Sequence, residues 1–291
     1  DEDKVALREF MMREVPDIER IRFRQLTLER MTEQLDQYLS GYDQVLVDVF
    51  GGDSLLAVAL YQYGLERNLP TVALDIEKGR QYEWQGGQLL VADMAIPSLS
   101  IQQMISLRGG KILHSKQPTF GPRQVAAIKK LACMAIAHPH QWSAVTQFFS
   151  LAETHDLRSS TKKVLDNKGK SYHYPQEMMA LLMEAGMIRI ESEEKNRVAY
   201  SFPNQVAQVF CRNKGYILEL YLYLLALESE LFEECSVGVE IDWNGIFPEV
   251  DNVQNEIDVI LRSGHSIIFI SCKMADLSVD AINELEVYAS H

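Results

Sequence analysis

The sequence contains few cysteines, and they show no pairing pattern. The 291 residues include Cys133, Cys211, Cys235 and Cys272. None of them lies in a Cys-x-x-Cys spacing, which argues against both a zinc site and a disulfide framework. We therefore expect reduced thiols in a cytoplasmic setting.

Long apolar runs and an excess of positive charge are also lacking. No apolar run approaches the roughly 20 residues that a membrane span needs, and the acidic N-terminus is unlike a signal peptide. The net charge of −13 argues against nonspecific duplex binding by the whole surface, because that binding depends on neutralising phosphates. A local basic site or a metal-bridged site stays open. The chain lacks a first Met and stops inside a helical pattern, so we expect both ends to be cut.

Two strands joined by a tight turn are predicted near the end of the sequence. The strands cover Glu256–Leu261 and Ser266–Cys272, and Ser263-Gly264 between them is a hairpin turn signal. The apolar run Ile267–Ile270 predicts a strand buried on both faces.

Charged side chains are placed on this hairpin by the alternation of strand faces. Glu256 and Asp258 share one face of the first strand, and Ser271 and Lys273 share one face of the second. Acids facing a lysine suit metal-dependent phosphodiester cleavage, in which a divalent cation activates water and a lysine stabilises the anion. The alternative is a hairpin with a solvated edge and an extended surface lysine.

A βαβ unit is predicted in the first third of the chain. A strand at Gln44–Val49, a helix at Leu55–Gly64 and a strand at Thr71–Asp75 predict a parallel pair with a crossover helix. Ligands of such sheets bind beyond the carboxyl ends of the strands.

The turn after the first of these strands is the candidate ligand loop. Gly51 and Gly52 permit close approach of the backbone to a ligand, and the helix N-terminus behind them favours anions. The alternative is an ordinary turn whose helix is capped by Asp53 or Ser54.

The middle of the chain resembles a winged helix. Helices at Gln124–Ala137, Trp142–Thr154 and Tyr174–Ala185 precede a β-ribbon formed by Met187–Ile190 and Val198–Phe202. The helix before the ribbon carries two Glu and no Lys or Arg, which favours scaffolding over DNA reading. The preceding segment, Ser159–Gly169, is basic and rich in turn residues.

An acid interrupts the apolar helix within Phe210–Glu230. Glu219 is costly there unless it is paired, exposed or bound to a cation, and its alternative is a position at the rim of the helix. A strand at Val237–Trp243, the hairpin and a helix at Asp280–Ala289 follow. This is the element order of a restriction-endonuclease-like core.

Together these motifs resemble the CARF–nuclease effectors of type III CRISPR antiviral defence. The resemblance rests on VLVDVFGGDSLLAVAL, KGYILELYLY and the pair NEIDVIL and FISCK. It implies an α/β fold with three parts: a Rossmann-like CARF domain over residues 1–120, a winged-helix-like domain over 121–209 and a PD-(D/E)XK nuclease domain over 210–291.

The resemblance also implies a catalytic site at the hairpin. Lys273 and Asp258 take the roles of the family's lysine and strand acid, with Glu256 and Ser271 beside them. Ser271 departs from the pattern, which has Asp or Glu there. Either Glu256 or Glu284 compensates, or metal binding is weakened, or the site is inactive. The implied ligands of Mn²⁺ or Mg²⁺ are Glu219, Asp258 and the backbone carbonyl of Cys272.

A messenger and a nucleic-acid substrate are further implications. Cyclic tetra-adenylate would bind Gly51, Gly52, Asp53 and Ser54 across a homodimer and activate cleavage of single-stranded DNA or RNA, or nicking of duplex DNA. Other classes stay open: a ligand-responsive DNA-binding regulator, or a sensor or adaptor without catalysis.

Overall fold

A computed structural model describes residues 2–15, 17–50, 53–245 and 254–274 of the chain. The chain divides into two compact units. One consists of Pro16–Ser98, and the other combines Asp1–Val15 with Leu99–His291. We call them the small unit and the large unit.

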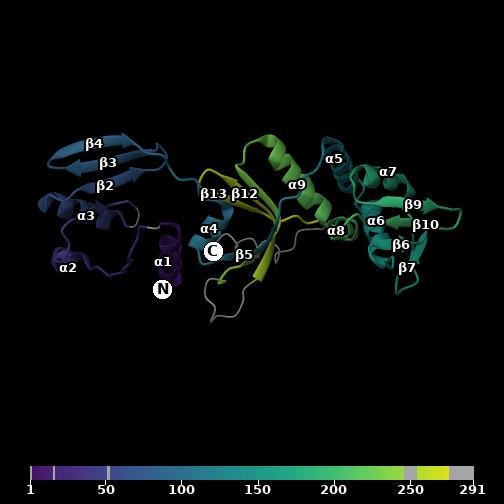
Figure 1. Cartoon of the computed structure of the whole chain (residues 1–291), viewed down its shortest axis with the longest axis horizontal. Coiled ribbons are helices and arrows are strands. Elements are labelled where there is room, and N and C mark those ends of the chain that lie inside the picture. Colours follow the sequence, from purple (N-terminus) through teal and green to yellow (C-terminus); the bar gives the residue numbers. More distant parts are fainter. Residues whose placement is uncertain (1, 16, 51–52, 246–253, 275–291) are drawn as a thin grey trace. The chain divides into compact units, whose positions relative to one another are not determined.

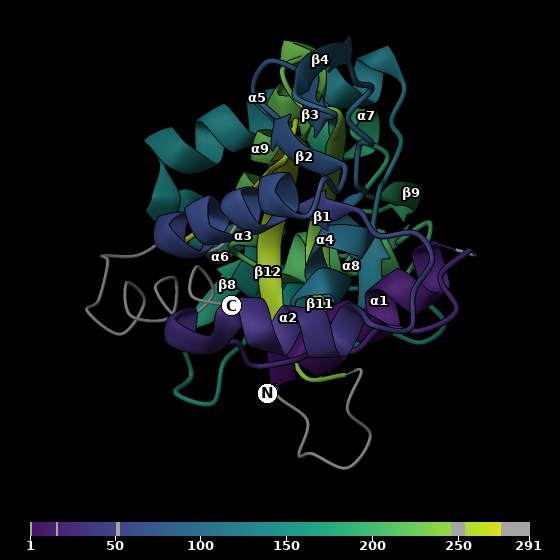
Figure 2. The ribbon, with the colours of Figure 1, turned by 90° about the vertical axis from the view of Figure 1, so that its left-hand side faces the viewer.

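The small unit is built on the predicted βαβ unit. Strands β1 (Val47–Asp48) and β2 (Thr71–Asp75) pair in parallel, and helix α3 (Ser54–Glu66) connects them and packs on both. The predicted parallel pair is thus confirmed (Figure 2). A short 3₁₀ helix, η1 (Leu28–Arg30), and helix α2 (Met31–Leu39) precede it.

Two antiparallel strands complete the sheet of the small unit in the order β1-β2-β3-β4. They are β3 (Arg80–Gln85) and β4 (Gln88–Asp93), and Gly86 and Gly87 form the turn between them at positive φ. Trp84 lies within β3 and pairs with Thr71 of β2. Its ring is held on the strand by an edge contact with Tyr61 of α3, at 5.0 Å between ring centroids.

The large unit contains the predicted hairpin in a four-stranded antiparallel sheet ordered β13-β12-β11-β5. Strands β12 (Gln254–Ser263) and β13 (Ser266–Ile270) form the hairpin, which confirms that prediction. Strand β11 (Glu234–Asp242) pairs with β12 and with β5 (Lys111–Lys116). Figure 1 shows helix α9 (Tyr216–Ser229) along this sheet.

Two parts of this sheet differ from expectation. Ile268 of β13 is 40% exposed, so the apolar run is not buried on both faces, because β13 is the last strand of the sheet within the described residues. Strand β5 lies before residue 120 but pairs with β11. The described sheet therefore draws on both sides of the boundary that the sequence suggested.

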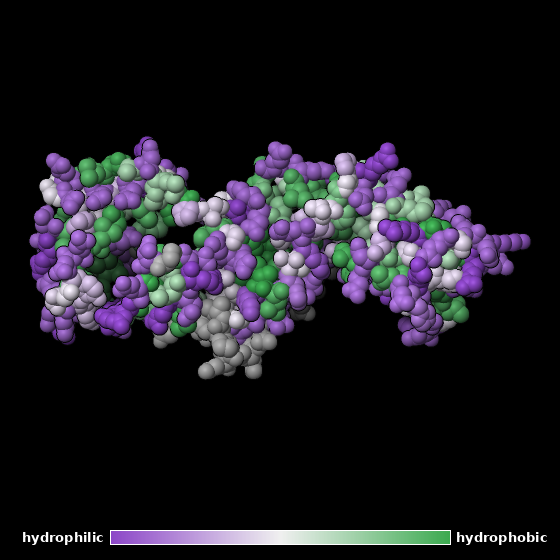
Figure 3. Space-filling view, in the orientation of Figure 1, coloured by the Kyte–Doolittle hydropathy of each residue, from purple (hydrophilic) through white to green (hydrophobic). Residues whose placement is uncertain are grey.

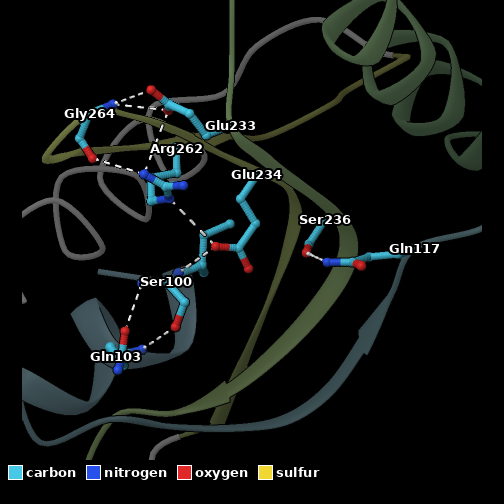
Figure 4. Close-up of polar contacts among 9 residues, drawn as sticks. Ser100, Gln103, Gln117, Glu233, Glu234, Ser236, Arg262 and Gly264 are labelled. Carbon is cyan, nitrogen blue, oxygen red and sulfur yellow. Dashed lines mark hydrogen bonds and ion pairs between the residues drawn. The ribbon is translucent and has the colours of Figure 1, made fainter. Parts of the chain in front are cut away.

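The turn of the hairpin is fixed by a buried arginine (Figure 4). Arg262 Nη1 donates a hydrogen bond to Gly264 O at 3.1 Å and lies 3.6 Å from a carboxylate oxygen of Glu233. Its Nε lies 3.5 Å from Glu234 Oε2, which also accepts a hydrogen bond from the backbone of Ile101. Helix α4 (Ile101–Leu107) is thereby tied to the start of β11, and α1 (Glu2–Glu14) packs on α4.

The helical lobe of the large unit lies between β5 and β11 in the chain. Helices α5 (Pro122–Ala137), α6 (Pro139–Leu151) and α7 (Gln176–Glu184) confirm the three predicted helices. Strands β9 (Arg189–Glu193) and β10 (Val198–Ser201) confirm the ribbon, and α8 (Gln205–Arg212) follows it. The largest buried side chains include Trp142, Phe148, Phe149, Tyr200 and Phe210, whose rings pack edge to face.

Three strands of this lobe were not expected from its basic, turn-rich segment. Strand β6 (Arg158–Ser160) pairs with β10, and β7 (Lys163–Leu165) and β8 (Ser171–His173) form a separate two-stranded hairpin. One hydrophobic core joins α5 to α9, β11 and β12, so the lobe and the sheet form a single packed body.

Candidate functional site

The candidate site lies where the first turn of α9 meets β12 and the segment that follows β13. Glu219 enters from α9 and is only 7% exposed. The loop before α9 is fixed from two sides: Asn213 Oδ1 accepts a hydrogen bond from Gly215 N at 2.9 Å, and Trp142 Nε1 donates to Lys214 O at 3.0 Å. The helical lobe thus sets the position at which α9 begins.

Burial and neighbouring acids raise the pKa of Glu219 to about 7. Desolvation is the largest cause, and the negative charges of Asp258 and Glu256 add to it. The positive charges of Lys116 and Lys273 act in the opposite direction. A buried carboxylate that shares its surroundings with two other acids is a site at which a cation relieves repulsion.

Asp258 is bound to the segment that follows β13. Its Oδ2 accepts a hydrogen bond from Cys272 N at 2.5 Å and another from the Ser271 hydroxyl at 3.3 Å. Ser271 therefore lies beside Asp258, as expected. Its hydroxyl and the backbone N–H of Cys272 donate to the same carboxylate oxygen. The other carboxylate oxygen has no hydrogen bond among those that the structure describes.

The buried Cys272 side chain is an unsuitable metal ligand. Burial raises the pKa of its thiol to about 12, and the charges of Asp258 and Glu219 add to this effect. The thiol therefore stays protonated at neutral pH. The backbone carbonyl differs: Cys272 O lies 4.0 Å and Glu219 Oε1 lies 3.8 Å from the point that a Cβ on Gly215 would occupy. Glycine here leaves space between a carbonyl and a carboxylate.

Lys273 and Glu256 are exposed at the edge of the same site. Their charges reach the buried carboxylate, since Lys273 lowers and Glu256 raises the pKa of Glu219. The structure thus brings together Glu219, Glu256, Asp258, Ser271, Cys272 and Lys273.

Sequence reasoning missed Lys116. This lysine is the last residue of β5, and its Nζ lies 5.8 Å from the centroid of the Tyr216 ring. The same Nζ atom lies 3.1 Å from the point that a Cβ on Gly238 would occupy. Glu256 Oε1 lies 3.4 Å from that same point. Gly238 has a φ of 57° inside β11. A single glycine within a predicted strand indicates a β-bulge, and this was the signal in the sequence that could have pointed to this place.

Tyr216 forms the floor beneath Lys116. It is 3% exposed, and burial together with the charges of Glu219 and Glu256 raises the pKa of its hydroxyl to about 12. The hydroxyl oxygen is buried without a hydrogen-bond partner in the described structure. An unpartnered polar atom next to the acids is consistent with a site that is completed by a ligand.

Side chains alone do not form a complete metal cage within residues 2–15, 17–50, 53–245 and 254–274. No group of three His, Cys, Asp or Glu side chains there is arranged to hold a metal ion. The donors that converge are the carboxylates of Glu219 and Asp258 and the carbonyl of Cys272. Glu284, the alternative acid, lies outside the described residues.

The candidate messenger loop in the small unit shows the alternative capping role. Asp53 accepts hydrogen bonds from Leu55 N at 2.7 Å and Leu56 N at 3.3 Å, so its carboxylate caps α3. Ser54 is the first residue of that helix. Gly51 and Gly52 lie outside the described residues. The ligand contacts of these four residues stay predictions.

Two further findings concern the setting of the site. All four cysteines lie in the described ranges and are free thiols. Among the helices that the structure describes, none has both the length and the apolar character needed to cross a membrane.

Comparison with proteins of known structure reveals a shared fold. The chain resembles Can2 from Sulfobacillus thermosulfidooxidans, solved in complex with cyclic tetra-adenylate, with a TM-score of 0.61 and 16% identity over 99% of this chain and 74% of Can2. It also resembles VC1899 from Vibrio cholerae, with a TM-score of 0.58 and 14% identity over 89% of this chain and 66% of that protein. The sequence matches no family profile and no curated protein. The likeness confirms the α/β fold class.

Proposed function

We propose that the protein is a metal-dependent nuclease that responds to a cyclic oligoadenylate and acts in CRISPR defence. The observation that carries the proposal is the convergence of Glu219, Asp258 and the Cys272 carbonyl beside exposed Lys273. Three oxygen donors with a lysine at the rim match the chemistry of phosphodiester hydrolysis.

The donor set suits a hard divalent cation such as Mn²⁺ or Mg²⁺. Glu219 and Asp258 would supply negative charge, and the Cys272 carbonyl would supply a neutral oxygen. When bound, such a cation lowers the pKa of a water molecule and neutralises charge on the phosphate. The raised pKa of Glu219 supports this assignment, because burial and, after it, repulsion from Asp258 and Glu256 destabilise the charged carboxylate, and a bound cation would offset both effects.

The remaining residues act on the substrate phosphate. The Lys273 ammonium donates to a nonbridging phosphate oxygen and stabilises the charge that develops during cleavage. Lys116 adds a second positive charge over Tyr216. The nearby carboxylate of Glu256 partly neutralises this charge. Asp258 orients the segment that carries the lysine through its bond to Cys272 N.

The messenger part of the proposal is supported by the shared fold. Can2 was solved in complex with cyclic tetra-adenylate, and the match covers 99% of this chain. We assign the messenger to the loop between β1 and α3, including Gly51, Gly52, Asp53 and Ser54, in a homodimer. By linkage, the messenger must bind the active arrangement more tightly than the idle one. DNA or RNA is the proposed substrate.

A second candidate is a messenger sensor without cleavage. Ser271 favours it, because a neutral hydroxyl stands where an acid is expected and occupies the same oxygen of Asp258 as Cys272 N. The weaker donor set would then lower metal affinity below what catalysis requires.

The deciding experiment is a cleavage assay with the full chain, Mn²⁺ and three substrates: single-stranded DNA, single-stranded RNA and supercoiled plasmid. Each is incubated with and without cyclic tetra-adenylate. Cutting that requires the messenger supports the switched nuclease and identifies its substrate. Messenger binding without cutting of any substrate supports the sensor instead. Absence of both would overturn both proposals.

A further inference from the structure

The β7–β8 hairpin carries a concentration of positive charge in an acidic chain. Between Arg158 and His173 the sequence has five Lys or Arg side chains and one acid, Asp166, whereas the whole chain has a net charge of −13. This segment lies in the helical lobe of the large unit, at an end whose visible surface is largely hydrophilic (Figure 3).

The single acid of the segment is used to shape the turn. Asp166 Oδ1 accepts hydrogen bonds from Lys168 N and Lys170 N, both at 2.9 Å, and Asp166 N donates to Lys170 O. Gly169 completes the turn at a φ of 80°. The carboxylate thus fixes the backbone of the two lysines and forms no ion pair with either side chain.

Three lysines of the hairpin remain available to an anion. Arg158 and Lys162 are paired with Glu191 and Glu193 at 3.2 and 3.0 Å. Lys163, Lys168 and Lys170 are exposed and have no ion pair within the described part of the chain. Lys168 and Lys170 lie in the turn between the two strands. Lys163 lies at the opposite end of the hairpin, where it pairs with His173.

An aromatic ring lies beneath one of these charges. Lys170 Nζ is 5.0 Å from the centroid of the partly buried Tyr172 ring. The Tyr172 hydroxyl donates to Asp166 Oδ2 at 3.5 Å, which ties the ring to the turn. The result is a preformed two-stranded ribbon with three exposed lysines, and neutralisation of phosphates by such side chains is the main source of nonspecific affinity for nucleic acid.

The helix that a winged helix uses to read DNA does not share this charge. Helix α7 carries Glu177 and Glu184 and no Lys or Arg. A cavity of about 820 Å³ beside the hairpin is lined by Glu153, Glu191 and Glu194 and also by Arg158 and Arg197, and Arg158 is paired with Glu191. The charges in this cavity therefore largely offset one another, whereas the three exposed lysines of the hairpin carry no such pairing within the described residues.

We propose that the β7–β8 hairpin binds the phosphate backbone of a nucleic-acid strand through Lys163, Lys168 and Lys170, without reading its sequence. The inference rests on the proposed function only in taking nucleic acid as the partner. It adds a holding surface, separate from the cleavage site, through which the acidic protein retains its substrate.

The test measures binding without cleavage. Fluorescence anisotropy of a labelled 20-nucleotide oligothymidylate, in EDTA and from 50 to 200 mM salt, compares the full chain with the triple variant K163A/K168A/K170A. Loss of three contacts to a single strand should reduce the slope of log K against log salt by about 2. Affinity at 50 mM salt should fall roughly tenfold or more.

Two variants serve as controls. K163R/K168R/K170R retains the charges and should bind like the wild type. R123A/K130A/K111A removes three exposed charges elsewhere in the large unit and should leave the slope nearly unchanged. Equal losses in the hairpin and control variants, an unchanged slope in the hairpin variant, or no binding by the wild type would overturn the proposal. So would binding of the hairpin to anionic vesicles in preference to the oligonucleotide.

Cleavage kinetics separate this proposal from the nuclease proposal. If the protein cleaves, the hairpin variant should raise KM and leave kcat unchanged, and an unchanged KM would refute the holding surface alone. If the wild type binds through the hairpin but never cleaves with Mn²⁺ and the messenger, the nuclease proposal fails and the holding surface stands.

Discussion

The backbone N–H of Cys272 donates a 2.5 Å hydrogen bond to Oδ2 of Asp258. The strand acid therefore holds the start of the segment that carries Lys273. Because the carboxylate of this proposed metal ligand is bound to the residue before the proposed catalytic lysine, the backbone positions of the two groups are coupled. Substitutions around this pair give direct tests of the site.

Replacing Lys273 by Ala should abolish most cleavage and leave folding intact. The ammonium is proposed to stabilise charge in the transition state, and loss of one such donor costs about 10² to 10³ in kcat. The side chain is exposed, so the free energy of unfolding should change by no more than about 0.5 kcal/mol. Cleavage rates and thermal unfolding measure both, with Lys130→Ala as the control. Full activity in the Lys273 variant would refute the site assignment.

Ser271→Asp should restore the acid that the nuclease pattern has at this position. Without metal, a second carboxylate beside Asp258 should lower the free energy of unfolding by about 1 kcal/mol through like-charge repulsion. With Mn²⁺, the added oxygen should tighten binding, measured by calorimetric titration. Ser266→Asp, at the start of β13, the strand that precedes Ser271, is the control and should bind no more metal than the wild type. Equal Mn²⁺ affinity in both variants would show that Ser271 does not face the cation.

Glu219 should make the protein less stable as the pH rises. Its pKa is about 7 in the folded protein against 4.5 as the ordinary value, so its contribution is fully present below pH 4.5 and is lost as the pH rises through 7. The loss is about 3 kcal/mol by linkage. Denaturant unfolding from pH 5 to 8 should show a flatter profile for Glu219→Gln than for the wild type or for Glu177→Gln, whose carboxyl is exposed. Mn²⁺ should stabilise the wild type at pH 8 and have less effect on Glu219→Gln; the reverse would argue against a cation at this carboxylate.

Lys116→Ala should weaken substrate binding more than it slows the chemical step. Its ammonium lies over Tyr216 at the rim, so its loss should raise KM roughly three- to tenfold, the effect of about 1 kcal/mol. Steady-state kinetics separate KM from kcat, and Lys116→Arg should recover most of the affinity. Lys111→Ala, at the other end of β5, provides a matched loss of charge. A fall in kcat alone would instead assign Lys116 to the reacting groups.

Asp53→Asn should tighten binding of cyclic tetra-adenylate. Asn caps a helix as well as Asp does, so α3 should keep its cap, while loss of the negative charge at the helix N-terminus favours a phosphate by about 0.3 to 1 kcal/mol. Equilibrium binding of the labelled messenger measures the change. Asp53→Ala should lower the free energy of unfolding by about 1 kcal/mol through loss of the cap. Weaker messenger binding by the Asn variant would mean that the carboxylate itself contacts the ligand.

Sequence patterns predicted the elements whose stabilising signals are local. The hairpin turn at Ser263-Gly264 and the helical periodicity of Gln124–Ala137 were sufficient, and the structure has β12, β13 and α5 at these places. The acids and the lysine of the site were also expected near one another, because they lie on one hairpin, directly after it, or on one adjacent helix, and the structure places them close together.

The elements that the sequence did not predict depend on distant partners. For strand β5, with the sequence KILHSK, the apolar pair Ile112-Leu113 indicates a short strand, but the pairing of Lys116 with Val237 is set by tertiary packing and has no local signal. The place of Lys116 in the site follows from that pairing alone. Strands β6 and β7 are three residues each, too short to show a period in the sequence.

The pairing of β5 with β11 has a consequence for how the chain acquires its structure. A ribosome must synthesise the whole helical lobe after Lys116 before Val237, its partner, exists. Closing so long a loop in an unfolded chain is slow, because contacts distant in sequence raise the contact order. Folding of the lobe first would bring its two ends together and shorten the effective loop. We therefore expect the lobe to assemble before the sheet, and the proposed cleavage site to be the last part of the large unit to form.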